Sequence, residues 1–130
     1  MNPRTYCLLA LLAAVSANCR PTEPLRVETI QLGRALNPDN SVAGHTTQFR
    51  PGDTIYVSVL TPAAGSGTIG VRWSYAGRVV GEPKKDVSYR GAAATEFHIV
   101  NSGGFPAGDY SVEVFLNGVS AGTRAFRVEQ

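Results

Sequence analysis

From residue 25 onward, apolar side chains recur at every second position, and no stretch carries the 3.6-residue spacing of a helix with defined ends. In TIYVSVL, for example, Ile55, Val57 and Val59 alternate with Tyr56 and Ser58. Gly and Pro residues separate such stretches, as they separate strands. The stretches are 25–32, 54–60, 68–75, 78–81, 95–100, 110–116 and 123–128. The pattern predicts an all-β protein with a single antiparallel β-sandwich of about seven strands.

The N-terminus has the layout of a secretory signal. One positive charge, Arg4, precedes an apolar run over residues 8–17, and polar, Pro-containing sequence follows. The run is about half the roughly 20 residues that a membrane-spanning helix needs. We therefore expect residues 1–18 to be a signal peptide, 19–24 to be a short polar tether, and 25–130 to be the folded domain.

Two processing routes remain open at the end of this signal. The residues Val15 to Ala17 offer a small-x-small site for ordinary cleavage after Ala17. Alternatively, Cys19 resembles the modified cysteine of bacterial lipoproteins, and that resemblance implies a diacylated N-terminus. The chain has two cysteines, Cys7 and Cys19, so a processed protein keeps at most one and forms no internal disulfide. Because a lone exported thiol is a liability, we favour lipidation of Cys19.

The stretch FPAGDYSVEVFLNG, residues 105–118, predicts a corner of the sandwich rather than a catalytic or binding site. Tyr110 is the first inward residue of its strand. In immunoglobulin-like (Ig-like) sandwiches, a tyrosine at this corner buries its ring and bonds its hydroxyl to nearby backbone. Asn117-Gly118 can supply the positive φ angles of a tight hairpin turn. We therefore expect a structural role for Tyr110.

A second Ig-like feature is the single tryptophan, Trp73, in the middle of a predicted strand, where it is expected to be buried and structural. Aliphatic residues such as Val112 stand where antibody domains carry cysteines. The following segments carry a wider likeness: LGRALNPDNSVA, TTQFRPGDTIYVSV, VRWSY, TEFHIV and FPAGDYSVEVFLNG. With them the chain resembles a group of small exported bacterial proteins, often lipoproteins, with an Ig-like β-sandwich and no assigned activity.

The charge pattern argues against a nucleic-acid partner. The formal net charge is +2, and removal of Arg4 with the signal leaves 11 of the 12 basic residues against 10 acidic ones. Only Lys84 and Lys85 are adjacent among the basic residues, so no basic stripe exists that could neutralise a phosphate backbone.

Candidate catalytic and metal-binding motifs are weak. The histidines, His45 and His98, lie far apart and lack zinc-ligand spacing. The sequence NPDNS at 37–41 predicts a turn rather than a calcium loop, and GSG at 65–67 predicts a hairpin tip rather than a phosphate loop. No G-x-S-x-G motif is present. We therefore expect no metal, no cofactor and no enzymatic activity, and keep a small hydrolase only as a third hypothesis.

The remaining candidate is a contact surface. If Val112 and Val114 point inward, Phe115 points outward, and Arg72 and Arg127 are among the outward residues of the strands expected beside it. An exposed aromatic ring among arginines is typical of protein contact surfaces.

These observations favour a non-catalytic envelope protein. It would be held in a bacterial membrane by the lipid on Cys19, face the periplasm or the exterior, and bind a protein or another envelope component. The alternative hypothesis is a secreted inhibitor or accessory subunit of an exported enzyme.

Overall fold

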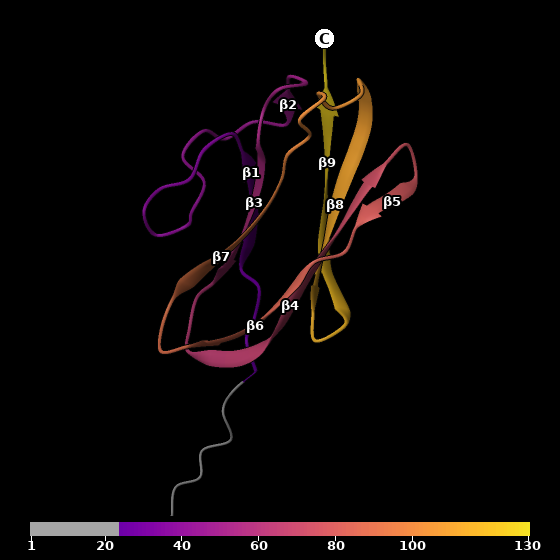
Figure 1. The fold of residues 1–130 in the computed structure, drawn as a ribbon. Coiled ribbons are helices and arrows are strands. Elements are labelled where there is room, and N and C mark those ends of the chain that lie inside the picture. The colour runs from indigo at the N-terminus through magenta and orange to yellow at the C-terminus, as the bar shows by residue number, and fades with distance from the viewer. Residues whose placement is uncertain (1–23) are drawn as a thin grey trace, which may run out of the picture.

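The computed structural model describes residues 24–130, and they form two β-sheets that pack face to face (Figure 1). The smaller sheet has the order β1-β3-β7, and the larger sheet has the order β2-β9-β8-β4-β5, with β6 also paired to β4. The strands are β1 (Thr29–Gly33), β2 (Gln48–Phe49), β3 (Ile55–Thr61), β4 (Gly65–Tyr75), β5 (Arg78–Gly81), β6 (Lys84–Tyr89), β7 (Ala93–Ile99), β8 (Gly108–Leu116) and β9 (Val119–Val128). No helix among residues 24–130 is long and apolar enough to cross a membrane.

The predicted sandwich is confirmed, with nine strands where the alternation indicated about seven. The two additional strands are short or charged. Strand β2 has only two residues and pairs in parallel with β9, while β6 carries Lys84, Lys85 and Asp86 on an exposed edge and therefore lacks an apolar alternation.

The prediction of a hairpin tip at residues 65–67 is wrong. These residues belong to β4 and pair with β6, from Gly65 opposite Tyr89 to Gly67 opposite Val87. Gly67 allows close packing, because a Cβ atom there would lie only 2.9 Å from the side-chain oxygen of Asn117.

The core lies between the sheets, and the alternating apolar residues fill it. Ile55, Val57 and Val59 of β3 and Val112 and Val114 of β8 are fully buried. Apolar burial of this kind is the main favourable contribution to folding. Residues 24–130 contain no cysteine, so this core is stabilised by packing without a disulfide.

One expectation about β3 needs correction. Ser58 was expected on the outward face, yet it is completely buried. The loop that follows β1 covers it, and the Ser58 hydroxyl donates a hydrogen bond to the carbonyl oxygen of Asn40 at 2.7 Å. The residues that bury Ser58 are distant from it in the sequence. Alternation within a strand carries no information about such contacts.

The corner at the start of β8 has the geometry expected for an Ig-like tyrosine corner. The Tyr110 side chain is 6% exposed, and its hydroxyl donates to the carbonyl oxygen of Pro106 at 2.7 Å. At the other end of β8, Asn117 and Gly118 have φ angles of 51° and 80°, which are the values of a two-residue hairpin turn into β9.

Candidate contact surface

The outer face of the six-stranded sheet brings two of the predicted contact residues together. Strands β4 and β8 are neighbours, with Arg72 opposite Glu113 and Gly70 opposite Phe115. The guanidinium carbon of Arg72 lies 4.8 Å from the centre of the Phe115 ring, which is a cation–π arrangement. Phe115 is half-buried under this contact rather than fully exposed.

Acidic residues on both sides hold the Arg72 side chain in place. Its Nε donates to Oε1 of Glu82 at 2.6 Å, and its Nη1 lies 3.7 Å from Oε1 of Glu113. The hydrogen bond to Glu82 raises the pKa of Arg72 above its ordinary value, so the guanidinium remains charged. The side chain is still 42% exposed, and a partner can therefore reach both the cation and the aromatic ring.

A groove of about 520 Å³ runs beside this stack, and we call it the Phe115 groove. In the sheet register, Gly70 stands between Phe115 on β8 and Lys84 on β6. Because glycine has no side chain, Gly70 does not fill the space between them. The groove is lined by Thr68, Val71, Arg72, Glu82, Lys84, Phe115, Asn117 and Gly118. It offers an apolar ring together with charges of both signs, which suits recognition of a partner with mixed chemistry.

Of the lining residues, only Arg72 and Phe115 were identified from the sequence as contact residues, and Glu82, Lys84 and Asn117 are among those that were not. Lys84 begins the edge strand β6, and Glu82 lies two residues before it. This part of the sequence has no alternating apolar pattern that would predict a strand. Asn117 was predicted only as a turn residue, yet its side-chain oxygen also accepts a hydrogen bond from the Thr68 backbone N–H at 2.9 Å. The positive φ angle that identified Asn117 as a turn residue carries no information about that contact.

Arg127, the third predicted contact residue, does not belong to this surface. It stands opposite Asp109 in the register, and the two side chains form an ion pair at 3.2 Å. Asp109 lies six residues before Phe115 on β8, a separation of about 20 Å along a strand. The register therefore separates Arg127 from Arg72 and Phe115 along the sheet, although all three lie on its outward face.

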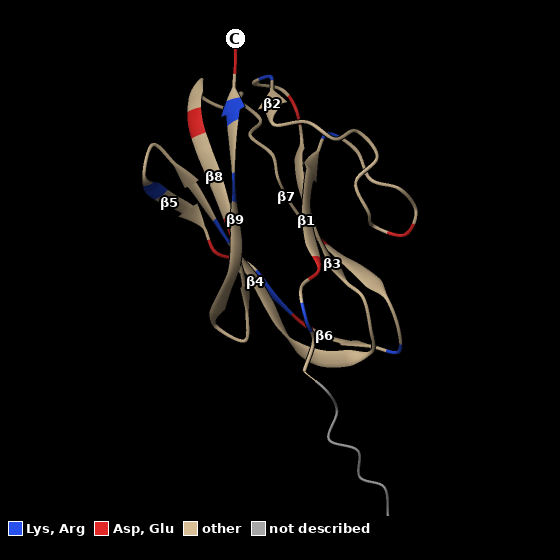
Figure 2. Cartoon of the chain, turned by 180° about the vertical axis from the view of Figure 1, so that it is seen from behind, with Lys and Arg blue, Asp and Glu red and all other residues tan. Residues whose placement is uncertain are grey.

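Basic and acidic residues are interspersed along the strands and loops, with no long segment of one sign in the ribbon of Figure 2. Several are paired within the domain. Glu96 is an example, since its Oε1 lies 3.4 Å from Nζ of Lys85 and its Oε2 lies 3.0 Å from Nδ1 of His98. This pattern does not resemble the continuous basic surface that binds a nucleic-acid backbone.

The other candidate residues lie apart from each other. His45 and His98 are both exposed, and no group of three His, Cys, Asp or Glu side chains that could hold a metal occurs among residues 24–130. In the NPDNS segment, Asp39 accepts hydrogen bonds from the N–H and the hydroxyl of Ser41, so it forms a local turn. Cys19, the predicted lipidation site, lies outside the described residues.

Comparison with known proteins defines the fold class. No protein-family model matches the chain, and no curated protein matches its sequence. Among solved structures, an immunoglobulin-like protein from Pseudomonas aeruginosa is similar at a TM-score of 0.58 and 12% identity, over 84% of this chain and 99% of that one. A variant β-glucosidase from Listeria innocua in complex with laminaribiose is similar at a TM-score of 0.50 and 14% identity, over 82% of this chain but only 16% of the enzyme.

These identities are too low to transfer an activity, and they establish the fold alone. The protein is an all-β, Ig-like sandwich. Its six-stranded sheet presents the Phe115 groove on the outer face.

Proposed function

We propose that the protein is a non-catalytic envelope lipoprotein whose Ig-like domain binds a protein or another envelope component. Acylated Cys19 anchors it to a bacterial membrane, and the domain faces the periplasm or the exterior. The observation that carries the binding role is the Arg72–Phe115 stack, which leaves an aromatic ring and a cation open to a partner beside the Phe115 groove.

The anchor is supported by the sequence before the domain. An apolar run ends just before Cys19, and only the residues RPTE separate Cys19 from Pro24, where the described chain begins. Pro24 forms a bridge to Ser66 at the start of β4, so the tether joins the sandwich at that end of β4. Two acyl chains provide stable attachment to a bilayer, whereas one provides only marginal binding.

Intact-mass analysis of the protein isolated from bacterial membranes tests the anchor. We expect a chain that begins at Cys19 and carries lipid. Cys19→Ser should release the protein from the membrane fraction, whereas the matched control Cys7→Ser should not, because Cys7 lies in the removed segment. An unmodified chain that begins at Asn18 would contradict the lipoprotein proposal.

Affinity capture from solubilised envelopes, followed by mass spectrometry, tests the binding surface. We expect a reproducible partner that is retained by the wild-type protein and by Arg127→Ser but lost with Phe115→Ser. Arg127 is the matched control, since it lies on the same sheet outside the groove. If the reproducible partner is an exported enzyme, the inhibitor or accessory-subunit hypothesis is favoured instead. If Phe115→Ser binds as well as wild type, the Phe115 groove is not the binding surface.

A further inference from the structure

A second groove lies where β5 and the end of β7 leave the sandwich open. Its volume is about 320 Å³, and Val80, Ile99 and Val100 form aliphatic walls. Val80 and Val100 are 58% and 67% exposed and belong to the few large apolar residues that are exposed among residues 24–130. Exposed apolar residues are ordinary when scattered, but a cluster around a hollow marks an interaction site. We call this site the valine groove.

The floor of the valine groove is aromatic and has little capacity for hydrogen bonds. Tyr75 and Tyr110 lie with their ring centres 4.5 Å apart. Their hydroxyls are occupied by the protein's own backbone, since Tyr75 donates to the carbonyl oxygen of Ala107 at 3.1 Å and Tyr110 to that of Pro106 at 2.7 Å. No charged side chain lines the groove. It therefore suits an apolar side chain.

The fold directs Val80 toward this groove through an irregularity in β5. The register between β4 and β5 shifts, so that Val79 stands opposite Ser74 and Gly81 opposite Trp73, and Val80 has no partner on β4. A β-bulge of this kind twists the strand and redirects a side chain. It also makes the outer edge of β5 a poor template for an added strand, so recognition here depends on side chains.

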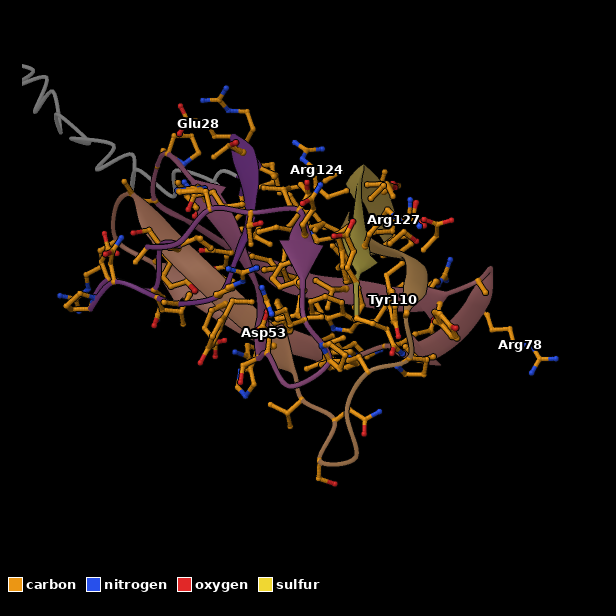
Figure 3. All side chains as sticks on the ribbon, turned by 90° about the horizontal axis from the view of Figure 1, so that it is seen from above. Glu28, Asp53, Arg78, Tyr110, Arg124 and Arg127 are labelled. Carbon is orange, nitrogen blue, oxygen red and sulfur yellow. The ribbon has the colours of Figure 1, made fainter. Side chains whose placement is uncertain are left out.

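Arg78 is an exposed cation beside Tyr75, although it is not itself one of the residues that line the groove. Arg78 is opposite Tyr75 in the register, and paired residues share one face of a sheet, so Arg78 lies on the groove side of β5. Figure 3 shows its side chain extending away from the ribbon. Arg78 forms no ion pair within residues 24–130. The cationic residues that do form ion pairs there are Arg34, Arg72, Lys85, His98 and Arg127. This uncompensated charge favours a carboxylate on whatever fills the groove.

The tether of the processed protein is too short to fill the groove itself. From Cys19 to Pro24 the chain spans at most about 18 Å. Pro24 lies beside Ser66, and the nine steps of β4 from Ser66 to Tyr75 cover about 30 Å. This step rests on the proposed cleavage at Cys19.

A second copy is also disfavoured. A symmetric contact through this patch would bring two uncompensated Arg78 side chains into one small interface.

We propose that the valine groove binds an extended segment of a partner protein that inserts an aliphatic or aromatic side chain and places an Asp or Glu carboxylate beside it. The apolar side chain covers the floor formed by Tyr75 and Tyr110 between Val80 and Val100. The carboxylate pairs with Arg78. The site is distinct from the Phe115 groove, which lies on the outer face of the sheet, and it gives the domain a second, charge-selective contact.

Selection from a random 12-residue peptide library displayed on phage tests this proposal with the purified full-length protein. We expect enriched peptides to share an apolar residue with Asp or Glu within two positions. Arg78→Glu should shift the selected residue from acidic to basic, and Arg78→Ala should weaken an enriched peptide roughly fivefold, as expected for a partly exposed ion pair. Val80→Asp should abolish its binding, and Phe115→Ser should leave it unchanged.

Both Arg78 and Val80 are exposed, and melting temperatures near that of the wild type will verify that the variants fold. Three results would overturn the proposal: no enriched consensus, a consensus without an acidic residue, or a consensus unaffected by Arg78→Glu. A concentration-dependent dimer that Val80→Asp dissociates would instead identify a second copy as the occupant. The selection uses no membrane, so a failure of the lipid assignment at Cys19 is detected separately by intact mass.

Discussion

The two faces of the six-stranded sheet use the same two strands for different purposes. Arg72 and Trp73 are consecutive on β4, and Tyr110 and Phe115 lie on β8 beside it. Trp73 and Tyr110 face the core and are almost completely buried, whereas Arg72 and Phe115 face outward and are half-buried. A shift of one residue along a strand thus separates a residue that stabilises the fold from one that a partner can touch.

The inner face is a connected cluster of aromatic rings. The Phe126 ring packs against Tyr110 nearly in parallel at 5.4 Å and meets Trp73 edge-on at 6.1 Å. Such pairs contribute beyond their buried area. On the outer face, the Arg72–Phe115 contact stands at an exposed site, where a cation–π pair contributes only about 0.5–1 kcal/mol. Substitutions on the inner face should therefore reduce stability, and those on the outer face should reduce binding.

Trp73→Ala should have the largest effect, a loss of about 3–5 kcal/mol in the free energy of unfolding, because it leaves a large cavity in the core. Chemical denaturation measures it. Trp73→Phe is the matched control and should cost less, since Nε1 of Trp73 has no hydrogen-bond partner among the described residues. An unchanged stability in Trp73→Ala would mean that the faces of β4 are assigned in reverse.

Tyr110→Phe should have an intermediate effect. It keeps the ring but leaves the Pro106 carbonyl without its donor, at a cost of about 1–3 kcal/mol. Partner binding at the Phe115 groove, measured well below the melting temperature, should not change. Equal stability of the mutant and the wild type, together with weaker binding at the Phe115 groove, would show that Tyr110 is a contact residue of that groove.

The same substitution should alter the pH dependence of stability. Burial, with a smaller contribution from Tyr75, raises the pKa of Tyr110 above its ordinary value. The unfolded chain then loses this proton at a lower pH than the folded protein does. The contribution of Tyr110 to stability is therefore fully present below about pH 10 and declines as the pH rises further. Denaturation at increasing pH should show this decline in the wild type and a smaller one in Tyr110→Phe.

Local sequence patterns predicted which residues face the core. Most of the features that they did not predict depend on contacts between segments that are distant in the sequence. Alternation alone indicated the buried positions of β3, β4 and β8, because strand periodicity directly records which face is apolar. It did not indicate β6, whose exposed edge has no apolar alternation, or the burial of Ser58 under a loop. Nor did it indicate the valine groove, which forms only where β5 and β7 end near each other.

The candidate contact surface was predicted in part for the same reason. Outward parity identified Arg72 and Phe115 correctly as neighbours, because both are fixed by the pairing of β4 with β8. Arg127 also points outward. Its position relative to Phe115, however, depends on the register between β8 and β9, including the shift between Val114 and Phe115. The alternation along a strand shows which face of the sheet a residue is on. Only the register between strands shows where along that face the residue lies.

Phe115→Ser provides the smallest effect on stability and the sharpest test of the comparison. It removes a half-buried ring and its contact with Arg72, so the free energy of unfolding should fall by only about 0.5–1 kcal/mol. Binding of a partner at the Phe115 groove should be lost, in contrast to Tyr110→Phe. Denaturation curves and binding isotherms of the two variants, measured together, separate the faces. If Phe115→Ser unfolds the protein while Tyr110→Phe leaves it stable, β8 has the opposite orientation, and the outer-face contact surface fails with it.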